Sequence, residues 1–207
     1  MVTLLTKQYK DILKSRQKSQ EKKIEVIIGC TNHAYKYPEI DSLIPNVEIA
    51  KLLVPLYIGD KSIDASEITA ILLYTNQKNV FEKYSEEFLT ISLAEMIHAD
   101  RLKELIVKLG GKITQVYTNT EATKIGSSVK EALQIAINSE IQTIANYEEV
   151  IKKLETFTFY PQRTTIIQYL NKIIADEKIH WEIFKKLLDQ ENMNDFVVSK
   201  TEIKINI

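Results

Sequence analysis

The stretch LAEMIHADRL, residues 93–102, places a glutamate three residues before a histidine, as Glu95 and His98. The stretch IADEKIHWEI, residues 174–183, repeats this spacing with Glu177 and His180. The chain has only three histidines, so two of them occur in the same Glu-x-x-His pattern. Residues three apart lie on one helix face. Each pair can therefore direct a carboxylate and an imidazole at one point, which is a ligand set for a divalent metal ion.

The same spacing also occurs in solvated ion pairs on helix surfaces, so the surrounding elements decide between the two interpretations. Five Gly and four Pro in 207 residues favour helices with few turns. The apolar spacing predicts a short helix that begins at Asn46 and four long helices, over residues 63–79, 84–109, 128–156 and 162–190. Short connections make the first and second long helices antiparallel, and likewise the third and fourth. The middle connection of about 17 residues can span roughly 55 Å, so it permits one crossover with the second and third helices parallel.

The two predicted hairpins repeat each other in sequence. SEITAILLYTNQ (66–77) aligns with SEIQTIANYEEV (139–150), which matches Glu67 with Glu140. AEMIH (94–98) aligns with DEKIH (176–180). In an antiparallel hairpin, residues equidistant from the turn lie at the same height. Both Glu67 with Glu95 and Glu140 with Glu177 have their midpoints in a predicted turn, so each hairpin sets a Glu opposite its Glu-x-x-His pair.

Four carboxylates and two imidazoles that face one core need a counter-charge, because buried carboxylates repel one another and lose hydration. Two divalent cations would balance the four negative charges. Mixed oxygen and nitrogen ligation suits Fe or Mn, and Zn less specifically. The matched positions therefore favour a metal centre over surface ion pairs.

This constellation resembles the ferritin-like di-iron and di-manganese carboxylate proteins over about residues 63–190. The resemblance implies an all-α, ferritin-like four-helix bundle with one long crossover between the second and third long helices. It implies two divalent metal ions, iron first and manganese as the alternative, and no catalytic residue beyond the metal centre. The implied ligands are Glu67, Glu95, His98, Glu140, Glu177 and His180. The implied bridging pair is Glu95 with Glu177, and Glu67 with Glu140 is the alternative.

Within this superfamily the chain is most similar to rubrerythrin-like and bacterioferritin-like members, without a rubredoxin domain. The similarity implies that Tyr74 and Tyr147 hydrogen-bond ligand carboxylates. Rubrerythrins add a second Glu three residues after the ligand on the third helix, where this chain has Thr143. The peroxide-driven ligand exchange of rubrerythrins is therefore not implied here.

Asp176 is expected to accept a hydrogen bond from a ligand imidazole, that of His98 across the bundle. Metal-bound histidines usually donate their free ring N–H to such an acceptor. The matching position in the other half is Ala94, so the two metal sites are expected to differ in affinity.

The resemblance implies an oxidoreductase that reduces or disproportionates peroxide, or reduces dioxygen, at a dinuclear centre. The expected partners are peroxide or dioxygen and an external electron donor, and the expected assembly is a homodimer. Two alternatives stay open: an iron-binding protein that oxidises and sequesters ferrous iron, and a structural module that metal only staples together. Rapid reoxidation of the reduced centre would separate the enzyme from the structural module.

Composition limits the class of protein, its partners and its cellular location. The chain is 44% hydrophobic and 27% charged with a net charge of −1, which is typical of a soluble globular protein and does not favour nucleic acid as a partner. No apolar run approaches the length of a membrane span. The single cysteine, Cys30, excludes an intrachain disulfide framework, and a reducing cytoplasm is the expected location. Cys30 and His33 are interpreted as loop residues and Trp181 as a packing residue.

Three regions are predicted from these patterns. Residues 1–45 form a partly irregular N-terminal extension, residues 46–190 form the four-helix bundle, and residues 191–207 form a C-terminal tail. Ile203, Ile205 and Ile207 alternate along this tail, which predicts a short strand.

Overall fold

The structure is a computed structural model that describes residues 37–60, 64–114 and 122–205, with side chains through residue 193. The described part contains the α-helices α3 (Val47–Ile58), α4 (Glu67–Val80), α5 (Ser85–Lys108), α6 (Val129–Glu155) and α7 (Arg163–Ile205), and the 3-10 turn η1 (Glu82–Tyr84). It contains no strand. The prediction of an all-α fold with four long helices is confirmed. Most of the predicted N-terminal extension, including Cys30 and His33, lies outside the described residues.

Three helices begin at polar N-cap residues that the sequence also suggests as caps. The Asn46 side chain accepts a hydrogen bond from the Ile49 amide at 3.1 Å, and Ser66 and Ser128 cap α4 and α6 in the same way. Such caps satisfy amides that have no partner within the helix. After the C-terminal end of α5, Gly110 adopts a φ of 81°. This conformation favours glycine and ends the helix.

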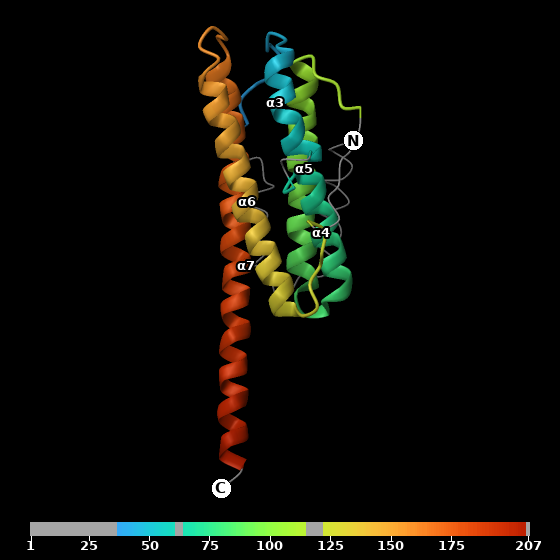
Figure 1. Cartoon of the computed structure of the whole chain (residues 1–207), viewed down its shortest axis with the longest axis vertical. Coiled ribbons are helices and arrows are strands. Elements are labelled where there is room, and N and C mark those ends of the chain that lie inside the picture. The colour runs from blue at the N-terminus through green and yellow to red at the C-terminus, as the bar shows by residue number, and fades with distance from the viewer. Residues whose placement is uncertain (1–36, 61–63, 115–121, 206–207) are drawn as a thin grey trace. The chain divides into compact units, whose positions relative to one another are not determined.

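The long helices form two hairpins, α4 with α5 and α6 with α7. In Figure 1, α5 and α6 both begin at the lower end of the bundle, so these two helices run parallel and the chain must cross the length of the bundle between them. The predicted single crossover is therefore confirmed, although residues 115–121 of this connection lie outside the described residues. None of the described helices has an apolar stretch long enough to cross a lipid bilayer.

The predicted strand in the C-terminal tail is wrong, because α7 continues as a helix to Ile205. No Gly or Pro follows Pro161 in the sequence, so nothing in the backbone chemistry ends the helix. Extending an existing helix avoids the unfavourable nucleation step. A strand would need a pairing partner, and the described part of the chain offers no strand. The alternation of three isoleucines does not outweigh the low cost of extending the helix and the lack of a pairing strand among the described residues.

The apolar core consists of two clusters with a polar layer between them. One cluster is formed mainly by α3 and by the halves of α5, α6 and α7 nearest to it, and contains Leu53, Leu102, Leu105, Leu154 and Leu170. The other lies toward the α4–α5 turn and contains Leu73, Phe88, Leu133, Phe184 and Leu187. Along α5, α6 and α7, the buried Glu95, His98, Glu140, Glu177 and His180 fall between the residues of the two clusters. The layer is thus shielded from water along the bundle axis.

Residues 37–45, which were predicted as part of the extension, form hydrogen bonds to the turn between α6 and α7. The Ile44 amide donates to Gln162 Oε1 at 2.7 Å, and Gln162 Nε2 donates to the Ser42 carbonyl at 2.8 Å. The Tyr160 hydroxyl donates to the Ile44 carbonyl at 2.8 Å. Ile40 and Leu43 are buried in the same cluster as α3.

Replacing the cap of α3 tests how this helix is held. Asn46→Ala leaves the Ile49 amide without its side-chain acceptor and should lower the free energy of unfolding by about 1 kcal/mol. Asn46→Asp keeps an acceptor oxygen at the same place and should cost less. Urea denaturation of both variants and the wild type measures the difference. An equal loss in the two variants would show that the cap does not stabilise α3.

Candidate metal centre

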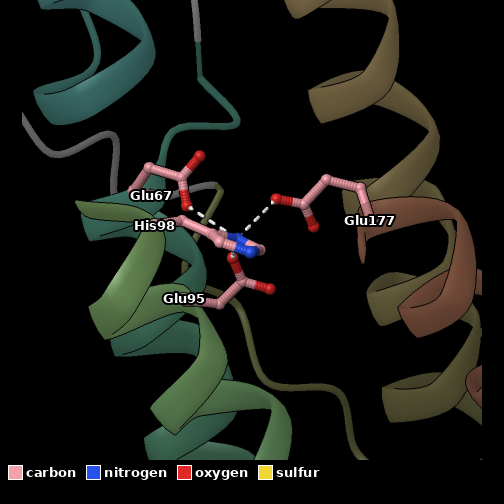
Figure 2. A group of neighbouring side chains, drawn as sticks. All are labelled: Glu67, Glu95, His98 and Glu177. Atoms are coloured by element: carbon pink, nitrogen blue, oxygen red, sulfur yellow. Dashed lines mark hydrogen bonds and ion pairs between the residues drawn. The ribbon is translucent and has the colours of Figure 1, made fainter. Parts of the chain in front are cut away.

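The structure brings together all six residues that the sequence proposes as metal ligands. They come from four helices and are each at most 2% exposed. Their donor atoms form two sets that share Glu95 and Glu177, with all atoms of a set within 4.8 Å of one another. The first set adds Glu67 and His98 (Figure 2). The second adds Glu140 and His180.

Three carboxylates surround one ring nitrogen of His98. Its Nδ1 lies 3.0 Å from Glu177 Oε1, 3.2 Å from Glu95 Oε2 and 3.7 Å from Glu67 Oε2. In Figure 2 these carboxylates approach the imidazole from different sides, Glu67 and Glu95 from one hairpin and Glu177 from the other. A single N–H cannot donate well to three oxygens, so this arrangement suits a cation placed among the four groups.

The second imidazole repeats the arrangement. His180 Nδ1 lies 2.9 Å from Glu95 Oε1, 3.1 Å from Glu177 Oε2 and 4.0 Å from Glu140 Oε2. Glu95 and Glu177 therefore each present one oxygen to His98 and the other to His180. The sequence allowed two choices of bridging pair, and this geometry favours Glu95 with Glu177. Glu67 and Glu140 each approach a single imidazole.

Unsatisfied oxygens show that these residues fit a metal ion. Glu67 Oε2, Glu95 Oε1 and Glu177 Oε1 are buried and make no well-directed hydrogen bond among the described residues, although the Glu95 and Glu177 oxygens lie close to a ring nitrogen that they share with other carboxylates. Buried carboxylate oxygens are costly without a partner. The donor set is rich in carboxylate and has one imidazole per cluster, which is the chemistry that Mn and Fe accept. The residues present thus fit divalent metal ions.

The electrostatics of the layer show how strongly it favours added positive charge. Burial, followed by the charges of Glu177 and Glu95, raises the pKa values of Glu67 and Glu140 well above the usual range. Burial also acts to raise the pKa values of Glu95 and Glu177, but the two imidazoles outweigh it and both values are lowered. Burial acts to lower the pKa of His98, and the Glu177 carboxylate and the other acceptors around the ring raise it well above normal. Without a metal, protons must supply the compensating charge.

Two tyrosines hold the outer carboxylates, and each reaches into the other hairpin. The Tyr74 hydroxyl on α4 donates to Glu140 Oε1 on α6 at 2.5 Å. The Tyr147 hydroxyl on α6 donates to Glu67 Oε1 on α4. In both carboxylates this leaves Oε2 directed at an imidazole. Burial raises the pKa of both phenols, so they remain protonated donors. The sequence did not specify that these contacts cross between the hairpins.

Asp176 lies where the sequence predicts it. Its Oδ2 is 3.3 Å from His98 Nε2, on the opposite side of the ring from the carboxylate cluster. An acceptor there fixes which ring nitrogen faces the cluster and makes it a better ligand. The corresponding residue for the second imidazole is Ala94, whose side chain offers no acceptor.

Sequence reasoning missed an aromatic pair, Tyr37 with Tyr169, that packs against Arg101. The ring centroid of Tyr37 lies 4.7 Å from that of Tyr169, and the guanidinium of Arg101 lies 5.4 Å from the Tyr37 centroid. Tyr37 precedes the repeated hairpins, so no internal repeat pointed to it. Trp181, in contrast, packs against the cluster around Phe184, in agreement with its predicted packing role.

Fold and site together define a class of protein. Two helical hairpins joined by one crossover, with a buried carboxylate and histidine cluster between them, are a ferritin-like carboxylate bundle. A family model described as Rubrerythrin matches residues 61–188, more than half of the chain. The chain therefore belongs to the rubrerythrin family. A comparison with curated proteins found no match.

Removing Asp176 should affect the two halves of the centre unequally. Asp176→Ala deprives His98 of its acceptor, so one metal should bind about 10–100-fold more weakly while the other binds nearly as in the wild type. Titration with Fe(II) or Mn(II), followed by calorimetry, separates the two events. Asp189→Ala, an exposed position on the same helix, is the control. Equal weakening of both events by Asp176→Ala would contradict the assignment.

Metal should also determine the stability of the bundle. An ion that binds only the folded state adds about 2.7 kcal/mol at a hundredfold excess over its dissociation constant, so chelator should lower the melting temperature. Replacing both Glu95 and Glu177 by Gln should remove this response. It should also raise the melting temperature of the metal-free form, because repulsion is removed while side-chain volume is kept.

The matched control replaces Glu104 and Glu182 by Gln, since these glutamates are exposed on the same two helices. This control should respond to metal as the wild type does. If the Glu95 and Glu177 double variant responds to metal equally, these two carboxylates do not hold the ion.

Proposed function

We propose that the protein is an oxidoreductase that reduces peroxide at a centre of two divalent metal ions, iron first and manganese as the alternative, with electrons from an external donor. The observation that carries the proposal is the sharing of Glu95 and Glu177, each with one oxygen toward each imidazole. Bound there, two ions would supply one electron each and a pair of Lewis-acid positions for an oxygen substrate.

The side chains around the centre would keep its geometry fixed during turnover. Glu95 and Glu177 would hold the ions at a short separation, and Glu67 and Glu140 would each complete one side. Tyr74 and Tyr147 orient these outer carboxylates through hydrogen bonds, and Asp176 orients His98. The apolar clusters above and below the layer exclude bulk water, which strengthens every electrostatic interaction inside it.

The number and burial of the carboxylates support turnover over a purely structural role. A metal that only stabilises the fold needs to balance charge. Two carboxylates that each offer one oxygen to either side would in addition hold two ions close enough to act on one substrate. Thr143, at the place where rubrerythrins carry a further Glu, is buried, and neither cluster contains a seventh ligand among the described residues. The proposed reaction therefore uses one fixed set of six ligands.

The test reduces the iron-loaded protein without oxygen and mixes it rapidly with hydrogen peroxide or with dioxygen. We expect faster oxidation by peroxide, followed by continued peroxide consumption when an electron donor is supplied. The double replacement of Glu95 and Glu177 by Gln should remove the reaction. The double replacement of Glu104 and Glu182 by Gln should not.

Two results would contradict this proposal. Faster oxidation by dioxygen, with ferric iron accumulating beyond two ions per chain, would favour iron sequestration. A centre that stays reduced in the presence of both oxidants would leave only the structural role of the metal.

A further inference from the structure

The two outer carboxylates of the centre stand at different places in their helices. Glu67 is the first residue of α4, directly after the N-cap Ser66. Glu140, its counterpart in the other hairpin, lies well inside α6. Helical hydrogen bonds therefore hold the backbone on both sides of Glu140, whereas Glu67 belongs to a helix end, where helices fray. Glu67 needs further contacts to keep its position.

The carbonyl of Ala65 provides one such contact. In α4 the first carbonyl that accepts a helical hydrogen bond is that of Ser66, which lies 2.9 Å from the Ala70 amide, so the Ala65 carbonyl has no partner within the helix. Ala65 is buried, and a buried carbonyl without a partner is costly. The side chain of Asn146 on α6 supplies the partner, because its Nδ2 donates to the Ala65 oxygen at 3.0 Å.

Asn146 is itself held in the orientation that this contact needs. It is buried, and its Oδ1 accepts a hydrogen bond from Gln142 Nε2 at 2.9 Å, which leaves the amide nitrogen for Ala65. The next residue, Tyr147, donates to the carboxylate of Glu67. Two neighbouring residues of α6 thus hold the start of α4, one through the backbone before the helix and the other through the ligand side chain.

The internal repeat shows that this backbone contact belongs to one half of the protein. The alignment that matches Glu67 with Glu140 places Leu73 at the position of Asn146. Leu73 is fully buried in the apolar cluster near the α4–α5 turn. The asparagine therefore occurs in the half whose tyrosine reaches a helix end, and the leucine in the half whose tyrosine reaches the interior of a helix.

We propose that Asn146 is a positioning residue for Glu67, and through it for the metal ion on the His98 side of the centre. By holding the Ala65 carbonyl, Asn146 fixes the point at which α4 begins. This in turn fixes Glu67 Oε2, which lies 3.7 Å from His98 Nδ1. Asn146 would act through Glu67 and not contact the ion itself. The inference rests on the metal centre of the proposed function and does not depend on its oxidant.

The test replaces Asn146 by Leu, the residue type at the matching position of the other half. Asn146→Leu keeps the size of the side chain but leaves the Ala65 carbonyl without a donor. Calorimetric titration with Fe(II) or Mn(II) in the absence of oxygen should show one ion bound about 10–100-fold more weakly and the other nearly as in the wild type. In the metal-free protein, hydrogen exchange should become faster at the amides of the first turn of α4.

Two further variants show on which ion Asn146 acts. Asp176→Ala weakens the ion on the His98 side, so Asn146→Leu added to it should weaken the same binding event and leave the other unchanged. Asn146→Ser guards against a failure of the leucine variant to fold. Its short side chain leaves room for a water molecule at the Ala65 carbonyl, while the direct contact with α4 is lost. It should show the same one-sided weakening, to a smaller extent.

Asn138→Leu is the matched control, because Asn138 is exposed on the same helix; this variant should bind both ions as the wild type does. Unchanged metal binding in the Asn146 variants, or equal weakening of both ions, would overturn the positioning role and leave the proposed function standing. A wild type that binds no metal would refute the proposed function, and the positioning role with it.

Discussion

The burial of four carboxylates and two imidazoles in one layer is the constraint on which the rest of the structure depends. Each of these groups loses its hydration, and the carboxylates repel one another. The two hairpins nevertheless hold them within a few ångströms. Such a layer needs compensating positive charge. Burial and the neighbouring carboxylates raise the pKa of Glu67, whereas the imidazoles of His98 and His180 lower the pKa of Glu177 against the effect of burial. Divalent cations would supply this positive charge in place of protons on the carboxylates and imidazoles.

The doubled hairpin explains how a chain with few histidines builds this layer. Each hairpin supplies one Glu and one Glu-x-x-His pair, and the crossover sets the two hairpins side by side (Figure 1). The contacts from Tyr74 to Glu140 and from Tyr147 to Glu67 then tie each hairpin to the other. The two halves differ at Asp176 and Ala94. That difference gives His98 a carboxylate neighbour that the corresponding position of the other half lacks, so the two sides of the centre are chemically distinct.

Most of the fold and the positions of the six side chains could be predicted because they depend on local rules. Helical spacing, caps such as Asn46 and the stop at Gly110 are local, and the midpoint argument placed Glu67 opposite Glu95 without any tertiary information. The helical end of α7 was not predicted. Three alternating isoleucines are typical of a strand, but the prediction did not consider that a strand needs another strand to pair with. The pairing of Tyr37 with Tyr169 was missed for a different reason. It joins residues far apart in sequence, and only the packed structure shows that contact.

Locating the bound metal in a crystal tests the central claim most directly. Anomalous diffraction from protein loaded with Fe(II) or Mn(II) should show two ions about 3.5–4 Å apart. Each should contact one oxygen of Glu95 and one of Glu177, with His98 on one ion and His180 on the other. A single ion, or ions bound elsewhere on the chain while this layer holds only protons and water, would contradict the account.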